Sequence, residues 1–256
     1  MITNLQQREI FHIAFLRQMA GRLRPNDYAV KGGVNLRLFF GSVRYSEDMD
    51  LDVREIEPFK LKDIAMAILA SKALHVALRP FGIEKIVPPD TTVAKQTDTT
   101  QRFKVHLVTA SSEDVFTKIE FSRRNMETPV KTETIDTAVL QFYKMPPLMV
   151  SHYPAEAAIL QKVRALAGRA ATQARDVFDI YMLLPRMKEA GALFKLEKGT
   201  LEKAYHNAFE LGFAVFRDTV LNYLNEEDRV VYNSKEAWED IQFKVGQSIN
   251  EIGVKK

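Results

Sequence analysis

The 256-residue chain contains no cysteine. This absence excludes disulfide bonds, thiolate metal sites and cysteine nucleophiles, and it is compatible with a reducing compartment. No apolar run approaches the roughly 18 residues that a membrane span requires. The N-terminal segment lacks the basic start and apolar stretch of a signal peptide. We therefore expect a cytoplasmic protein with no membrane partner.

The sequence also has little excess charge. Its 36 Lys and Arg residues and 33 Asp and Glu residues leave a net charge of +3, with a pI of about 8.9. These values permit a nucleic-acid partner but do not by themselves indicate one. There is no internal repeat and no low-complexity linker, and the length suits one large domain or two packed lobes.

Hydrophobic periodicity changes along the chain. The N-terminal part mixes helical patterns, for example over residues 60–78, with alternating patterns that predict strands. Beyond about Ser151 the pattern is helical almost throughout, with one helix expected after Pro154 and another ended by Pro185. We predict an α+β fold with a mixed sheet flanked by helices in an N-terminal lobe, residues 1–128. A mainly helical lobe is predicted over residues 129–256.

Acidic and apolar residues alternate from Asp48 to Val53. On a strand, Asp48, Asp50 and Asp52 would share one face while the apolar residues between them face the core. Neighbouring carboxylates repel one another, so this face must be either solvated or bound to a cation. Oxygen ligands of this kind suit Mg²⁺ or Mn²⁺. The acids therefore indicate a metal site or a solvated strand face.

A calcium-binding EF-hand loop is excluded by position. Counted from Asp48, the sixth residue of such a loop should be Gly and the twelfth Glu. The sequence has Val53 and Phe59 at these positions. We take Asp48 and Asp50 as the metal-binding pair.

A diglycine turn precedes these acids. Gly32-Gly33 lies between a predicted strand and a short predicted helix, where backbone N–H groups can bind a phosphate. Together with the metal-binding acids, it predicts a site for a nucleoside triphosphate. Glu120 alternates with apolar residues on a later strand and is either a third metal ligand or a surface residue. Arg44 is predicted to contact a phosphate or to pair with Asp48.

The joint spacing of these residues resembles a known family. The matching residues are Lys31-Gly32-Gly33, Leu36, Gly41, Arg44-Tyr45-Ser46-Glu47-Asp48-Met49-Asp50, and later Lys162, Arg169 and Arg175-Asp176-Val177-Phe178-Asp179. They resemble the AbiE-type (AbiEii/AbiGii) toxins of abortive-infection toxin–antitoxin systems, which belong to the DNA polymerase β-like nucleotidyltransferase superfamily. The resemblance covers roughly residues 5–185 and implies that the helical lobe contributes to the active site.

The resemblance assigns roles to individual residues. It implies metal binding by Asp48, Asp50 and Glu120, and catalytic roles for Asp48, Asp50, Lys162 and Asp176. It implies that the nucleotide phosphates are bound by Lys31, Gly32, Gly33, Arg44 and Ser46.

Helical spacing is compatible with the two later roles. Asp176 and Asp179 share one helix face, and so do Lys162 and Arg169. Lys162 could neutralise phosphates, while Asp176 could act as a general base or hold Lys162 in place. The alternative is an interhelical ion-pair network. We expect Asp179 and Arg169 to be structural.

The implied activity is transfer of a nucleoside monophosphate from an NTP to tRNA or another RNA, with Mg²⁺ or Mn²⁺ as cofactor. A cognate DNA-binding antitoxin is the implied partner in a type IV system. Two alternatives remain: transfer to a protein or small-molecule hydroxyl, and a non-catalytic protein of the same fold that binds nucleotide or a partner. One departure bears on nucleotide binding, because Val34 and Asn35 stand where the family often has a small hydroxyl residue, which Ser42 or Ser46 could replace.

Overall fold

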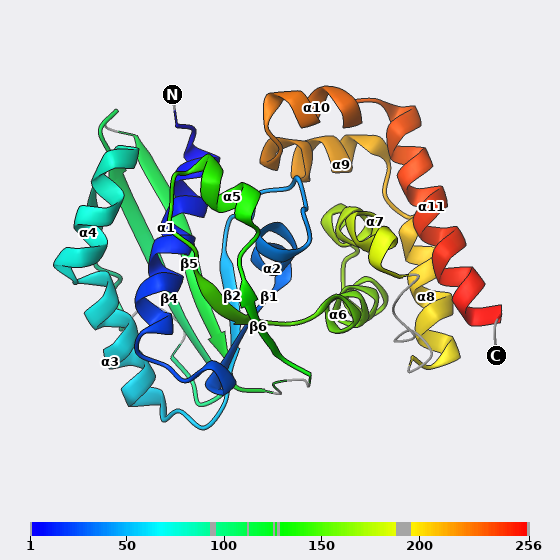
Figure 1. Ribbon diagram of the computed structural model, residues 1–256. Coiled ribbons are helices and arrows are strands. Elements are labelled where there is room, and N and C mark those ends of the chain that lie inside the picture. The colour runs from blue at the N-terminus through cyan, green and yellow to red at the C-terminus, as the bar shows by residue number, and fades with distance from the viewer. Residues whose placement is uncertain are drawn as a thin grey trace. The chain divides into compact units, whose positions relative to one another are not determined.

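The computed structural model describes residues 2–92, 96–111, 113–124, 126, 129–187 and 196–254. Within these residues the chain forms a seven-stranded mixed sheet and many helices (Figure 1). It divides into two compact units. Unit 1 contains Met1–Leu38 and Tyr45–Tyr153, and unit 2 contains Phe39–Arg44 and Pro154–Lys256.

Unit 1 contains the sheet, whose strand order is β3-β4-β5-β2-β1-β7-β6. The strands are β1 (Tyr28–Lys31), β2 (Met49–Val53), β3 (Ile83–Val87), β4 (Thr100–Thr109), β5 (Asp114–Ser122), β6 (Lys131–Thr134) and β7 (Met149–His152). The β2–β5 and β1–β7 pairs are parallel and the other pairs are antiparallel. The acid-rich strand β2 is therefore central, with a partner on each side.

Helices of unit 1 cover the sheet. They are α1 (Asn4–Ala20), α2 (Gly32–Phe39, whose last residue belongs to unit 2), α3 (Pro58–Leu69), α4 (Lys72–Leu78) and α5 (Thr137–Phe142), with the 3-10 helices η1 (Pro25–Asp27) and η2 (Arg79–Phe81). Helix α1 packs against β5, α3 and α4, and α4 also contacts β3 (Figure 1). Met49, Leu51 and Ile119 are fully buried. The apolar residues between the acids thus face the core, as the alternation predicts.

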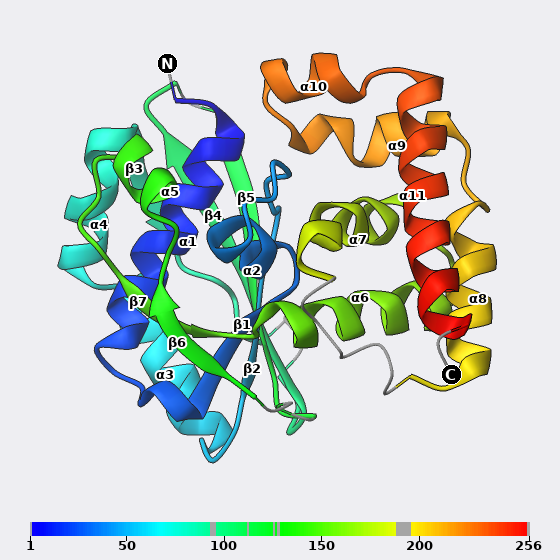
Figure 2. The same ribbon diagram turned by 45° about the vertical axis from the view of Figure 1, so that its right-hand side comes forward.

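Unit 2 is helical in its described residues. Its elements are α6 (Ala155–Gly168), α7 (Ala174–Met187), α8 (Lys198–Ala208), α9 (Phe213–Thr219), η4 (Leu221–Tyr223), α10 (Glu226–Tyr232) and α11 (Lys235–Val254). Helix α6 packs on α7 and α8, and α11 packs on α7, α8 and α9 (Figure 2). Phe216 stacks on Trp238 with ring centroids 4.3 Å apart, which ties α9 to α11. The predicted α+β fold class is confirmed.

Three local predictions differ from the structure. The helix predicted over residues 60–78 is two helices, α3 and α4. Ala70 is the C-cap of the first, and Ser71 caps the second by accepting a hydrogen bond from the Leu74 amide. Pro185 was expected to end its helix but lies inside α7. The predicted lobe boundary after residue 128 placed β6, α5 and β7 in the second lobe, whereas unit 1 extends to Tyr153 because β7 pairs with β1.

No single helix among the described residues is long and apolar enough to cross a membrane. Only the bent pair Pro58–Leu69 and Lys72–Phe81 meets the combined criteria of length and hydropathy. Within the fold, α3 and α4 pack against α1.

Candidate active site

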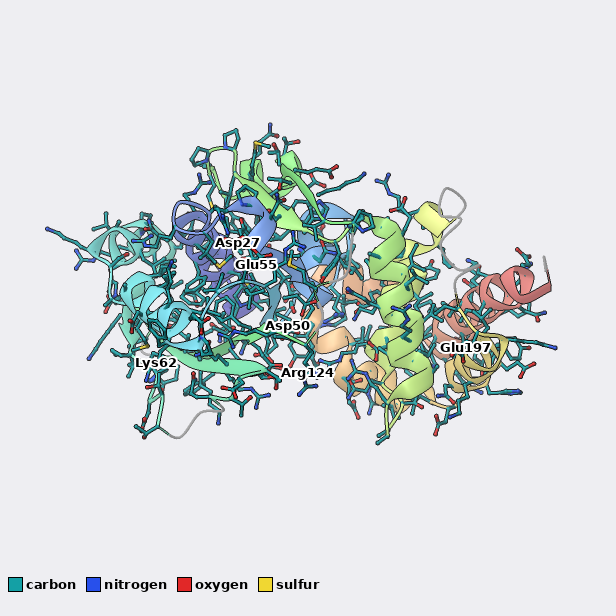
Figure 3. The ribbon with its side chains drawn as sticks, turned by 90° about the horizontal axis from the view of Figure 1, so that it is seen from below. Asp27, Asp50, Glu55, Lys62, Arg124 and Glu197 are labelled. Carbon is teal, nitrogen blue, oxygen red and sulfur yellow. The ribbon has the colours of Figure 1, made fainter. Side chains whose placement is uncertain are left out.

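The diglycine turn lies beside the acid-rich strand. Strands β1 and β2 pair in antiparallel register, so that Lys31 lies opposite Asp50. Gly32 has φ of 67°, a left-handed conformation that glycine adopts without strain, and it begins α2. A Cβ atom at Gly32 would lie 3.4 Å from Asp50 Oδ2. The structure thus brings Asp50 and the predicted phosphate-binding turn together, and Figure 3 labels Asp50 among the side chains of unit 1.

Asp48 lies directly before β2 and forms an ion pair. Its Oδ2 atom is 2.7 Å from Lys118 Nζ, and the Asp48 side chain is 32% exposed. Ser46, predicted to bind phosphate, donates a hydrogen bond from Oγ to the main-chain oxygen of Asp48 at 2.8 Å. Its hydroxyl therefore stabilises the turn that carries Asp48.

Asp50 and Glu120 face each other across the parallel pair β2–β5. Burial raises the pKa of the Asp50 carboxyl, and the nearby Glu120 carboxylate raises this pKa further, against the opposing effects of Lys31 and Lys118. Glu120 itself pairs with Arg102, whose Nη2 lies 2.7 Å from Glu120 Oε2. A buried carboxyl whose pKa is raised by a neighbouring carboxylate suits a position beside a cation.

Asp52 differs from Asp48 and Asp50 because it is buried and both of its carboxylate oxygens have partners. It is 4% exposed, and Lys31 Nζ lies 2.5 Å from its Oδ1 atom. The Tyr153 hydroxyl donates a hydrogen bond to Asp52 Oδ2 at 2.7 Å. Asp52 therefore belongs to the fold, and Lys31, predicted to bind phosphate, is its ion-pair partner.

The donor set at β2 fits a magnesium-type ion held partly by substrate. Among the described residues, no three His, Cys, Asp or Glu side chains gather into a group that could hold a metal ion. Mg²⁺, however, is commonly bound by one or two carboxylates together with substrate phosphates. Asp48 and Asp50 supply two such carboxylates, and that of Asp50 lies beside the Gly32 turn. Their chemistry fits Mg²⁺ or Mn²⁺ bound together with a triphosphate.

Unit 2 contains a cluster of buried charges that joins α6 and α7. Asp176 and Asp179 are fully buried. Lys162 Nζ lies 3.3 Å from Asp176 Oδ1 and 2.5 Å from Asp179 Oδ2. Arg169 Nε lies 2.5 Å from Asp176 Oδ2, and Arg44 completes the cluster. Three cations therefore surround two carboxylates, which leaves one net positive charge.

Arg44 pairs with Asp179. Its Nε and Nη2 atoms donate to the two carboxylate oxygens at 3.0 and 2.9 Å. Burial alone would raise the pKa of Asp179, but Arg44 and Lys162 outweigh it and hold that pKa below its usual value. The interhelical ion-pair network that we considered for these helices is therefore present. Asp179 and Arg169 have the structural contacts expected of them, and Lys162 and Asp176 belong to the same network.

No side-chain hydroxyl follows the diglycine turn. Asn35 is fully buried and donates from Nδ2 to the Tyr153 main-chain oxygen at 2.9 Å. Its Oδ1 atom lies 3.0 Å from His152 Nδ1. Ser42, 1% exposed, lies in unit 2, and its Oγ atom faces the Arg44 amide at 3.4 Å. The Asn35 side chain is thus bound within unit 1, and the Ser42 hydroxyl has its contact with the Arg44 amide within unit 2.

Some of the residues around the acids could not be identified from the sequence. Lys118 and Arg102 pair with Asp48 and Glu120, and Tyr153 binds Asp52. Lys118 had one available signal, because it precedes Glu120 by two residues and so lies on the same strand face. The other two come from a different strand and from the end of β7, so only the strand pairing reveals them.

A diglycine turn at the start of a helix, beside paired acids on a central strand, is the arrangement of a nucleotidyltransferase. The sequence model of the "Nucleotidyl transferase AbiEii toxin, Type IV TA system" family matches residues 14–245. The chain therefore belongs to the AbiEii nucleotidyltransferase toxin family, and it is a nucleotidyltransferase. A search of curated proteins gave no significant match.

Solved structures share the fold at low sequence identity. JHP933 from Helicobacter pylori is 19% identical with a TM-score of 0.57, and the match covers 96% of this chain and 90% of JHP933. MenT4, a nucleotidyltransferase toxin from Mycobacterium tuberculosis, is 16% identical with a TM-score of 0.57. That match covers 97% of this chain and 84% of MenT4. At these identities the likeness concerns the fold.

Proposed function

We propose that the chain is a metal-dependent toxin that transfers a nucleoside monophosphate from an NTP to a hydroxyl of an RNA acceptor. The observation that carries the proposal is the 3.4 Å between Asp50 Oδ2 and a Cβ atom placed on Gly32. A carboxylate suited to a cation and a turn suited to a phosphate therefore adjoin. Membership of the AbiEii family favours this enzyme over the non-catalytic alternative.

The reaction joins the acceptor oxygen to the α-phosphorus of the NTP. The bond from that phosphorus to the oxygen bridging the α- and β-phosphates breaks, pyrophosphate leaves, and the proton of the acceptor hydroxyl passes to water. Asp48 and Asp50 would hold Mg²⁺ or Mn²⁺ together with the phosphates of the NTP. Glu120, predicted as a third ligand, pairs with Arg102 and does not form a three-carboxylate group with them among the described residues. The metal supplies a lower pKa for the acceptor hydroxyl and neutralises charge on the departing pyrophosphate. The main-chain N–H groups at Gly32 and Gly33 would bind phosphate oxygens.

The ion cluster of unit 2 supports a phosphate-binding role for Lys162. The cluster has one net positive charge, and the Lys162 side chain is 11% exposed whereas those of Asp176 and Asp179 are fully buried. An anion would therefore meet the cations of the cluster, Arg169 with its side chain 36% exposed as well as Lys162, and not the carboxylates. Because Asp176 is enclosed by Lys162 and Arg169, its proposed role is to hold Lys162 and not to act as a general base.

Labelled nucleotides give the direct test. Wild-type protein incubated with each α-labelled NTP, Mg²⁺ and total RNA should transfer label to RNA. The double variant Asp48→Ala, Asp50→Ala should lose at least about 10²-fold in rate while remaining folded. Asp218→Ala, which removes an exposed acid on α9, is the matched control and should keep wild-type activity. Wild-type protein that labels no acceptor with any NTP, or a fully active double variant, would contradict the proposal.

The open side of the β4–β5 hairpin favours RNA as the acceptor. Lys104 lies opposite Lys118 in the strand register, and the next pair on the same face of the sheet is His106 and Phe116. The rings of His106 and Phe116 stack with centroids 4.7 Å apart, and Phe116 is 57% exposed. Lysines beside an exposed aromatic ring are the groups that bind single-stranded nucleic acids. These residues adjoin Asp48, since Lys118 is its ion-pair partner.

A substitution at Phe116 separates RNA from the other acceptors. If a nucleobase stacks on this ring, Phe116→Ala should weaken binding of a single-stranded oligoribonucleotide about tenfold. Phe59→Ala removes another exposed phenylalanine, from α3, and should have no effect. Fluorescence anisotropy measures both. Label that appears on protein or on a small molecule instead of RNA would identify the alternative acceptor.

The family also supports a partner protein. Type IV toxin–antitoxin membership suggests an antitoxin encoded next to this chain, and we propose that it is a DNA-binding protein. Wild-type protein expressed alone in bacteria should slow growth, while the Asp48→Ala, Asp50→Ala variant should not. Co-expression of the neighbouring gene should restore growth.

A further inference from the structure

The peptide group that precedes Asp48 is held by side chains from two other elements. Thr117 on β5 donates a hydrogen bond from Oγ1 to the main-chain oxygen of Glu47 at 2.7 Å. Ser46 donates from Oγ to the main-chain oxygen of Asp48 at 2.8 Å. The main-chain oxygens of Glu47 and Asp48 thus both accept a hydrogen bond from a side chain. Asp48 itself lies before β2 and outside the hydrogen-bond ladder of that strand.

A buried histidine holds Thr117 in turn. His12 on α1 is 2% exposed, and its Nε2 atom lies 2.8 Å from Thr117 Oγ1. The single hydroxyl proton of Thr117 is directed to Glu47, so the imidazole must be the donor in this contact. Burial, and secondarily the charge of Arg8, lower the pKa of His12 to about 3. The ring is therefore neutral at physiological pH and offers the required N–H group.

We propose that His12 and Thr117 are positioning residues that fix Asp48 as a metal ligand through the Glu47 carbonyl. This inference rests on the proposed function, because it assigns Asp48 to the metal. The chain His12 Nε2–H, Thr117 Oγ1–H and Glu47 carbonyl runs from the buried helix α1 to the turn before β2. It determines where that turn ends and hence where the Asp48 carboxylate lies relative to Asp50. Hydrogen-bond partners of this outer kind typically change metal affinity about 10- to 100-fold when removed.

The alternative is that these groups only satisfy one another's hydrogen bonds in the core. Thr109 at the end of β4 offers a matched comparison. It is 2% exposed, and its Oγ1 atom donates to the main-chain oxygen of Glu113 at 3.0 Å. Like Thr117 it is a buried threonine that binds a carbonyl, but its carbonyl belongs to the β4–β5 turn and not to the turn before Asp48.

The test compares Thr117→Val, Thr117→Ser and Thr109→Val in the full-length protein. Mn²⁺ binding is measured by electron paramagnetic resonance, stability by urea denaturation, and kcat and KM by nucleotide transfer. Both valine variants should lose similar stability. Only Thr117→Val should weaken Mn²⁺ binding at least about tenfold and lower kcat with little change in KM for RNA. Thr117→Ser retains the hydroxyl and should restore both values.

The result that overturns the inference is Mn²⁺ affinity in Thr117→Val equal to that of the wild type and of Thr109→Val. Should Thr117→Val not fold, His12→Leu provides the same test, because it removes the imidazole donor and leaves the Thr117 hydroxyl in place. Wild-type Mn²⁺ affinity in His12→Leu would then overturn it. A wild-type protein that binds no Mn²⁺ and transfers no nucleotide would instead reject the proposed function together with this inference, so the two failures are distinguishable.

Discussion

At the scale of single residues, the carboxylates of two aspartates on β2 differ in how well their surroundings stabilise a negative charge. Asp52 is buried and accepts from Lys31 and Tyr153, so its negative charge is satisfied. Asp50 has a raised pKa, caused first by burial and then by Glu120, so its negative charge is unfavourable where it stands. Removing charge from the two positions should therefore have opposite consequences for stability.

We expect Asp52→Asn to lower the free energy of unfolding by about 2 kcal/mol, because it leaves Lys31 without its partner. Asp50→Asn should leave stability unchanged or slightly higher, yet it should be the variant that abolishes nucleotide transfer. Urea denaturation at pH 7 and the transfer assay measure the two effects. An equal loss of stability in both variants would show that Asp50 also belongs to the fold.

At the scale of elements, the contact of α1 with β5 should make stability depend on pH. His12 has a pKa of about 3 in the folded chain against 6.5 as its ordinary value. Above pH 6.5 the imidazole is neutral in both states, so its full contribution to stability is present. Between pH 6.5 and 3 the unfolded chain binds a proton that the folded chain does not. Stability is therefore lost as the pH falls through this range.

The slope is about 1.4 kcal/mol per pH unit for one such group. From pH 6.5 to pH 5 the wild type should lose about 2 kcal/mol more than His12→Leu. Urea denaturation of both proteins at several pH values isolates the difference, since the other titrating groups are common to them. If the stability of the two proteins varied with pH in the same way, the pKa of His12 would not be lowered in the folded chain.

Most of the elements with a strong apolar periodicity can be predicted from the sequence. Elements without such a periodicity cannot. The strand predicted before Gly32-Gly33 is β1, and the alternation around β2 and β5 located both of those strands. Strand β6 has four exposed residues and β7 is short, so neither shows an apolar alternation. The break between α3 and α4 depends on one capping hydrogen bond to Ser71, which apolar periodicity does not register.

The candidate site was predictable only in part for a related physical reason. The motif identified Gly32, Asp48 and Asp50, because spacing along the chain places them. Pairings between strands and helices depend on tertiary structure, so the sequence could not show that Asp52 is bound by Tyr153. It likewise could not show that Arg44 pairs with Asp179, because this carboxylate lies far along the chain.

At the scale of the whole molecule, the chain leaves unit 1, contributes one short segment to unit 2, and returns. The segment Phe39–Arg44 belongs to unit 2 although both its neighbours belong to unit 1. The two hydrogen bonds from Arg44 to Asp179 attach this segment to α7. The integrity of unit 2 therefore depends on a pair of residues far apart in the sequence.

Removing the acid of this pair should be strongly destabilising. Asp179→Asn leaves Arg44 and Lys162 buried beside a neutral amide, and we expect a loss of about 3 kcal/mol or more in the free energy of unfolding. Asp240→Asn removes the partner of Lys244 in an exposed pair on α11, where the Asp240 side chain is 52% exposed. That control should lose less than about 0.5 kcal/mol. Comparable losses in urea denaturation would contradict a structural role for Asp179.

The central place of β2 has a consequence for control of the enzyme. This strand is bonded to β1 on one side and to β5 on the other, so Asp50 cannot shift unless two ladders of hydrogen bonds break together. An inhibitor that works by displacing Asp50 would have to break both ladders. Inhibition is therefore expected to come from a partner that blocks access to the site or from reduced synthesis of the protein. The blocked enzyme should remain folded, and its activity should return when the partner dissociates.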